Sequence, residues 1–182
     1  MTLMSNAIEQ TGETEDSSIK EINSAMISHG SQIAEEIGAN AVLVYVDVIK
    51  SRKNLEYLIK ESRCILAARS RDVIDGLLEM EGAEDRVIQV PFMDLSRFNQ
   101  IKIATMLALS NELIRPGDRL VCLSGSPTYG ILDNIRVLDV SREFELFSSG
   151  NLAITDHVTV PHVFDRLFTL AMDLAEEGRA SL

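Results

Sequence analysis

The side chains best placed for chemistry lie in one short stretch that follows a run of four apolar residues. That run, residues 120–123, predicts a strand buried on both faces. The stretch after it combines two glycines with several hydroxyl side chains. Hydroxyls and free backbone N–H groups at the carboxyl end of a strand can hold a phosphate or a carboxylate. The predicted ligand-binding residues are Ser124, Gly125, Ser126, Thr128, Tyr129 and Gly130.

The alternative for this stretch is a tight connector whose glycines only relieve backbone strain. It lacks the Gly-Lys-Ser/Thr ending of a P-loop and leads into a strand rather than a helix.

A basic segment after the first predicted strand is a second candidate for anion binding. Lys50, Ser51, Arg52 and Lys53 stand in succession where a helix is predicted to begin. Because helix N-termini attract anions, we predict Ser51 and Arg52 as neighbours of the same ligand. The segment has no glycine to let a ligand approach the backbone, so a solvated basic face is the alternative.

No group of residues predicts catalysis. Asp47 and Asp94 follow predicted strands at one sheet edge, where two carboxylates could bind a metal or act in acid–base chemistry. Such residues more often cap a helix or fix a turn. His29, His157 and His162 lack ligand spacing, and no known catalytic or dinucleotide motif is present. We therefore predict no catalytic residue, no metal and no cofactor.

Apolar runs that alternate with helical segments indicate the fold. The predicted strands cover residues 41–46, 64–68, 87–90, 120–123 and 135–140. The predicted helices between and before them cover residues 18–38, 54–60, 71–80 and 96–113. This alternation predicts a parallel sheet with helices on both faces. The link between the last two strands is too short for a crossover helix, so the fifth strand should be antiparallel, at an edge. The expected fold is a three-layer α/β/α sandwich.

Composition divides the chain into three parts. Residues 1–17 are acidic, without Lys or Arg, and are predicted to be mobile. Ser17-Ser18 offers the cap of the first helix. Residues 18–147 form the predicted α/β domain. Residues 148–182 are predicted to be a linker and an amphipathic helix at 161–177.

Charge and cysteine content exclude several classes of protein. A formal net charge of −11 over 182 residues argues against nucleic-acid binding. Cys64 and Cys122 lie in separate apolar runs and are expected to be buried free thiols. No signal peptide is visible, and no apolar run reaches the roughly 18 residues of a membrane span. We expect a cytoplasmic protein that binds neither nucleic acid nor membrane.

Residues 115–137 resemble the end of the C-terminal α/β domain of pyruvate kinase. The resemblance rests on a Gly-Asp turn, a Ser-Gly step, a loop glycine and an Asn-x-Arg-Val strand. The matching residues are Gly117, Asp118, Ser124, Gly125, Gly130, Asn134, Arg136 and Val137. Because that domain is regulatory, the resemblance implies the same architecture and a role away from catalysis.

The segment 171–179, Ala-Met-Asp-Leu-Ala-Glu-Glu-Gly-Arg, is similar to the helix that leads into diadenylate cyclase domains. Some archaeal and bacterial cyclases carry a pyruvate-kinase-C-like domain in front, which residues 18–147 resemble. The Asp-Gly-Ala and Arg-His-Arg motifs of the cyclase are absent here. The resemblance thus implies an accessory domain whose partner is a following cyclase domain, without activity of its own.

Three functions remain open from the sequence. The first is a regulatory domain that binds a small anionic metabolite or nucleotide near residues 124–130. The second is a ligand-free assembly module that forms a homo-oligomer through the edge strand and the last helix. The third is a small enzyme that acts on a phosphorylated substrate through Asp47 and Asp94.

Overall fold

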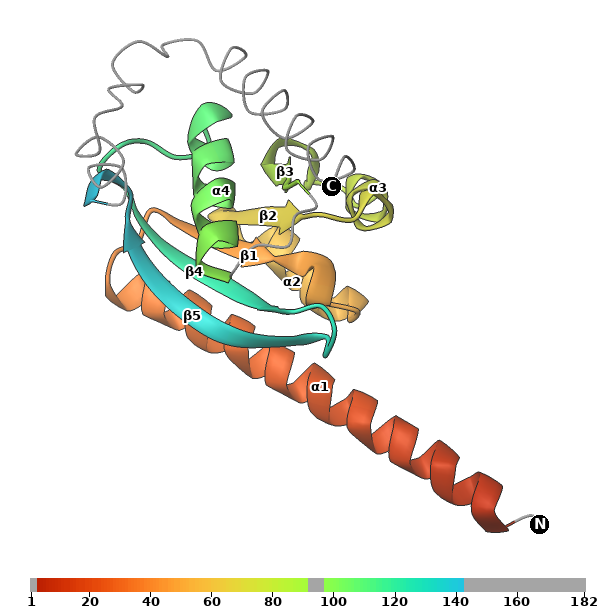
Figure 1. Ribbon diagram of the computed structural model, residues 1–182. Helices are drawn as coiled ribbons and strands as arrows, with labels where there is room; N and C mark the ends of the chain where they lie inside the picture. Colours follow the sequence, from red (N-terminus) through yellow and green to blue (C-terminus); the bar gives the residue numbers. More distant parts are fainter. Residues whose placement is uncertain (1–2, 92–96, 143–182) are drawn as a thin grey trace, which may run out of the picture.

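The computed structural model describes residues 3–91 and 97–142, which form a five-stranded sheet between two layers of helices (Figure 1). The strand order is β3-β2-β1-β4-β5, parallel throughout except for β5, which pairs antiparallel with β4. The strands are β1 (Ala41–Tyr45), β2 (Cys64–Ala68), β3 (Val87–Gln89), β4 (Arg119–Ser126) and β5 (Ile131–Asp139). The predicted α/β fold with an antiparallel edge strand is confirmed.

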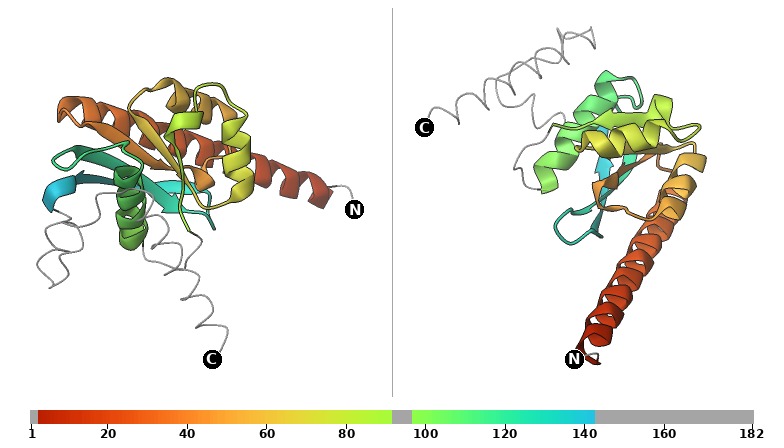
Figure 2. Two further views of the ribbon diagram at one scale, coloured as in Figure 1. Left: turned by 90° about the horizontal axis from the view of Figure 1, so that it is seen from above. Right: turned by 90° about the vertical axis from the view of Figure 1, so that its right-hand side faces the viewer.

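In the described part of the chain, four α-helices cover the sheet. One short 3-10 helix follows β1, and a second precedes β3. They are α1 (Leu3–Glu36), α2 (Arg52–Lys60), α3 (Arg71–Leu78), α4 (Arg97–Ser110), η1 (Val46–Val48) and η2 (Glu84–Arg86). Helices α1, α2 and α3 pack on one face and α4 on the other, as two views show (Figure 2). Every residue of β1 and of β2 is buried, because both faces of these central strands are covered.

Helix α1 is longer than predicted. It begins at Leu3, not at Ser17-Ser18, so residues 3–17 of the segment expected to be mobile are helical. The packed part of the helix, which buries Ile27 and Ala34, supplies the nucleus, and adding further turns to an existing helix is far less costly than starting one. The N-terminal part extends past the sheet (Figure 1).

Helix α4 approaches the sheet through small side chains. Ile101 is buried, and Ala104 and Ala108 are fully buried and bring the helix backbone close to the strands. The Tyr45 hydroxyl from β1 donates a hydrogen bond to the Gln100 carbonyl at 2.5 Å, which ties α4 to the centre of the sheet.

The β4–β5 hairpin extends further than the sequence predicted. Both strands continue toward the turn, which leaves only residues 127–130 between them. Ser124 and Gly125, predicted as part of an exposed loop, lie buried inside β4. The pairing shifts register between these two residues, as at a β-bulge.

Several sequence predictions fall outside the described residues: Asp94, the first residue of the helix predicted at 96–113, and the linker and helix of residues 148–182. Within the described ranges, no helix is both long and apolar enough to cross a membrane.

Candidate functional site

A pocket of about 320 Å³ lies where three distant segments of the chain meet. Helix α1 forms one wall, the connection from η1 to α2 a second, and the β4–β5 turn the third. We call it the hairpin pocket. Its lining residues are Ile19, Lys20, Asn23, Val48, Lys50, Ser51, Pro127, Thr128, Tyr129 and Gly130.

Asn23 fixes the turn against α1. Its side chain is only 3% exposed, and it donates to the Gly130 carbonyl at 2.9 Å. Its carbonyl oxygen accepts the backbone N–H of Leu132 at 2.7 Å. The Gly130 φ of 65° suits glycine, and its N–H closes the turn onto the Ser126 carbonyl at 2.9 Å. One wall of the pocket is therefore held in a defined conformation.

A second network joins α2 to α1 beside the pocket. Ser51 is the N-cap of α2, and its hydroxyl accepts the Asn54 N–H at 3.4 Å. The Asn54 side-chain oxygen accepts from the Ser24 hydroxyl of α1 at 3.1 Å. The neighbouring Lys50 is exposed and lines the pocket.

The pocket is basic in an acidic chain. Among its described lining residues there are two lysines, three hydroxyl side chains and no carboxylate. The chain as a whole has a formal net charge of −11. A cavity that gathers ammonium groups and hydroxyls suits a small anion, since each can donate a hydrogen bond to it.

The structure brings together four of the eight predicted ligand residues: Ser51, Thr128, Tyr129 and Gly130 all line the hairpin pocket. Ser124 and Gly125 do not line it, and the buried Ser124 hydroxyl makes no hydrogen bond within the described part of the chain. Ser126 contributes its carbonyl to the turn.

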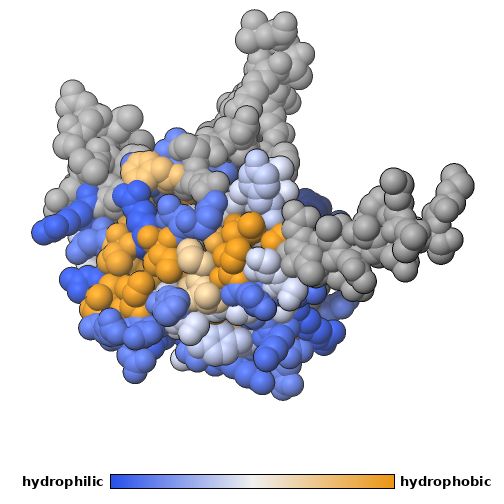
Figure 3. All heavy atoms as spheres, turned by 90° about the horizontal axis from the view of Figure 1, so that it is seen from below, coloured by the Kyte–Doolittle hydropathy of each residue, from blue (hydrophilic) through white to orange (hydrophobic). Residues whose placement is uncertain are grey.

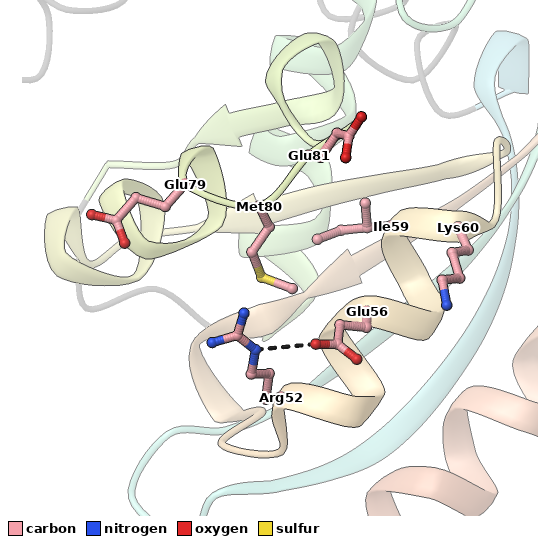
Figure 4. Close-up of a pocket in the computed structure, with 7 residues that line it drawn as sticks. All are labelled: Arg52, Glu56, Ile59, Lys60, Glu79, Met80 and Glu81. Carbon is pink, nitrogen blue, oxygen red and sulfur yellow. Dashed lines mark hydrogen bonds and ion pairs between the residues drawn. The ribbon is translucent and has the colours of Figure 1, made fainter.

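Arg52 lies in a different hollow. Together with other residues of α2 and the segment that follows α3, Arg52 lines a cavity of about 200 Å³. Its Nε lies 3.0 Å from Glu56 Oε1 (Figure 4). The Met80 side chain points toward this ion pair, and Glu79 and Glu81 add two further carboxylates. Because acidic and basic groups are mixed there, this hollow selects neither anions nor cations.

Sequence reasoning missed the contribution of α1. Ile19, Lys20 and Asn23 line the pocket more than 100 residues before the turn. One signal was present: Asn23 falls on the stripe that Ile27 and Ala34 continue, where an amide side chain needs a buried partner. The sequence does not show that this partner is the backbone of the β4–β5 hairpin.

Asp47 has a structural role. Its carboxylate accepts the Arg69 N–H with both oxygens, each at 3.0 Å, and the Ser70 N–H at 3.0 Å. Ser70 is the N-cap of α3, so Asp47 fixes the start of that helix from the end of β1. The alternative given for Asp47, that it caps a helix, therefore explains its position, and no catalytic or metal-binding role is needed.

Burial keeps two ionisable side chains, Cys64 and Tyr45, in their neutral form. Burial, reinforced by nearby Glu61, raises the pKa of the Cys64 thiol to about 12. Burial also raises the pKa of the Tyr45 hydroxyl well above its usual range. Over the described residues, no three His, Cys, Asp or Glu side chains gather in a way that could hold a metal ion.

The chain thus forms an α/β/α domain whose five-stranded sheet has an antiparallel edge strand and a pocket at its hairpin. The chain belongs to the DacZ_P family, described as a probable sensor domain, whose model matches residues 23–147. Such domains stand N-terminal to the diadenylate cyclase DacZ, which confirms the resemblance seen in the sequence.

Among solved structures, the chain is similar to a pyruvate kinase from Cryptosporidium parvum, with 15% sequence identity and a TM-score of 0.49. The match covers 65% of this chain and 23% of the pyruvate kinase, so the chain spans less than a quarter of that enzyme. No curated protein matches the chain.

Proposed function

We propose that this domain is a noncatalytic sensor that binds a small anionic metabolite in the hairpin pocket. The observation that carries the proposal is the convergence of Lys50, Ser51 and Thr128 in a pocket that is lined by no carboxylate from the described part of the chain. The description of the family as a probable sensor domain supports a sensing role.

Size and surroundings favour a small ligand over a polymer. A volume of about 320 Å³ lies at the lower end of the roughly 300–1,000 Å³ typical of small-molecule sites. The net charge of −11 repels an extended polyanion at long range, whereas a small anion meets mainly the local lysines.

The position of the pocket offers a route for a signal. A bound ligand would touch α1, the start of α2 and the hairpin turn together, so it favours the arrangement in which all three are close. To regulate a following cyclase domain, the ligand must bind one activity state more tightly than the other. Sensing and coupling are thus separate steps, and a binding measurement reports on the first alone.

Replacing Lys50 with glutamine is expected to weaken binding of the anion about tenfold, since hydrogen bonds to charged groups contribute roughly 1.5–3 kcal/mol. The test is calorimetric titration of the full chain with phosphorylated sugars, nucleotides, citrate and inorganic phosphate. The matched control is Lys53→Gln, which removes the same charge from an exposed position of α2 outside the pocket lining.

An equal loss in both variants would mean that binding follows general surface charge, which contradicts the proposal. So would the absence of any binding by the wild-type chain across the whole set of anions.

A second function, assembly with another copy of the chain, is favoured by the outer surface of β5. This strand ends the sheet, and its Val137 side chain is 50% exposed. Val137 pairs with Val121 on the α1 side, where Ile22 is 40% exposed. Figure 3 shows apolar side chains gathered on this side of the molecule, with hydrophilic residues around them. An unpaired edge next to apolar surface is suited to pairing with a second copy.

If β5 mediates assembly, Val137→Lys is expected to convert a dimer into a monomer, because it places a charge in the buried contact. Mass in solution, measured by light scattering, is the readout. Leu78→Lys is the matched control, since Leu78 is similarly exposed, at 43%, on α3, which packs beside β3 at the opposite edge of the sheet. An unchanged mass for Val137→Lys, or a monomeric wild-type chain, would exclude this mode of assembly.

A further inference from the structure

The proposed anion site leaves one of its lining residues unexplained. Tyr129 lines the hairpin pocket, yet its side chain is 69% exposed, the highest value among the large apolar and aromatic residues described as exposed. An anion alone needs lysines and hydroxyls. A mostly exposed aromatic ring beside them is suited to a partner with a flat apolar surface.

The turn presents this ring from a fixed backbone. The Tyr129 N–H donates to the Ser126 carbonyl at 3.2 Å, and the adjacent Gly130 carbonyl is held by Asn23. Pro127 restricts the turn further. Because the backbone is already ordered, stacking a ligand on Tyr129 costs little additional conformational entropy.

We propose that the ligand is of the nucleotide class, with a phosphate at the Lys50 and Ser51 side and a planar base stacked on Tyr129. This inference rests on the proposed anion site and adds the ring to it. Bases stack on aromatic side chains with little regard to sequence, since every base has a π-face. The volume of about 320 Å³ suits a mononucleotide better than a chain of nucleotides.

The test compares AMP, ribose 5-phosphate and adenosine as probes of the full chain by calorimetric titration. We expect AMP to bind about tenfold more tightly than ribose 5-phosphate, since stacking on one aromatic side chain commonly gives an advantage of that order. Adenosine should bind more weakly than AMP, because it lacks the phosphate.

Two substitutions separate the ring from its hydroxyl. Tyr129→Leu should reduce the affinity for AMP to near that for ribose 5-phosphate and leave ribose 5-phosphate binding unchanged. Tyr129→Phe should retain the AMP preference, because it keeps the π-face. A loss of AMP binding in Tyr129→Phe as large as in Tyr129→Leu would assign the effect to the hydroxyl and overturn the stacking proposal.

Failure of this inference is distinguishable from failure of the anion site. If AMP and ribose 5-phosphate bind equally, depend on Lys50 and are indifferent to Tyr129, the base is not recognised and only the anion site remains. If neither phosphate probe nor any other anion binds, both proposals are wrong.

Discussion

Replacing Gly125 with alanine is expected to lower the free energy of unfolding by about 3 kcal/mol or more, at the upper end of overpacking effects. A Cβ at this position would lie 1.9 Å from the Ile131 carbonyl oxygen and 2.7 Å from its carbon. These are backbone atoms of the partner strand, so no side-chain rotation relieves the overlap, and the β4–β5 pairing must shift. Urea unfolding followed by circular dichroism measures the change.

Gly76→Ala is the matched control for this substitution. Gly76 lies in α3, where an added Cβ meets nothing within 4 Å and φ is not positive. Alanine there should raise the free energy of unfolding by roughly 0.5–1 kcal/mol, because glycine is the weaker helix former. Near-wild-type stability of Gly125→Ala would contradict the close approach of the two strands.

The same geometry bears on how the ligand site can be tested. Because Gly125 is required where β4 and β5 meet, a variant at this position that fails to bind ligand would report damaged structure. Lys50 and Tyr129, both exposed, can be changed with much less effect on the fold. Tests of the hairpin pocket therefore belong at those two positions.

The sheet could be predicted because its physical signals are local. The buried runs at β1, β2 and β4 are continuous apolar segments, and a strand covered on both faces needs just such a sequence. The antiparallel direction of β5 followed from the shortness of the link before it. Neither inference needed knowledge of a distant contact.

The length of the hairpin could not be predicted in the same way. Residues 124–126 of β4 read Ser-Gly-Ser, and Asp133 and Asn134 of β5 are exposed, all residue types that are depleted or weak in strands. Residues 124–126 are held extended by pairing across the hairpin with Asn134, Leu132 and Ile131, while Asp133 falls at the register shift. The strand propensities of the residues in one strand do not show how far that strand pairs with its neighbour.

The site was only half predictable for a related reason. Its hairpin residues and Ser51 carry recognisable turn and cap chemistry. The α1 wall was missed because its role depends on which helix covers the hairpin, and that is settled by packing of the whole sheet. Arg52 was included because it follows Ser51, but on a helix adjacent residues point in different directions.

Replacing Asn23 with alanine is expected to lower the free energy of unfolding by about 2–4 kcal/mol, because it leaves two buried backbone groups without partners. These are the Gly130 carbonyl and the Leu132 N–H, which the Asn23 amide joins across 107 and 109 residues of sequence. Asn23→Asp should not restore stability, since a carboxylate can accept from Leu132 but cannot donate to Gly130 while ionised. Thermal and urea unfolding of both variants test this.

Gln32→Ala is the control on the same helix, since its exposed amide donates a hydrogen bond to Glu36 within α1, and it should change stability by about 0.5 kcal/mol or less. A second readout connects Asn23 with the pocket. If Asn23 preorganises the turn, Asn23→Ala should weaken AMP binding even at temperatures where the variant is fully folded, whereas Gln32→Ala should leave it unchanged. Unaltered AMP binding in a folded Asn23→Ala variant would show that the turn keeps its conformation without the Asn23 hydrogen bonds. The ligand would then have to be coupled to α1 through Lys20 or Ile19 instead.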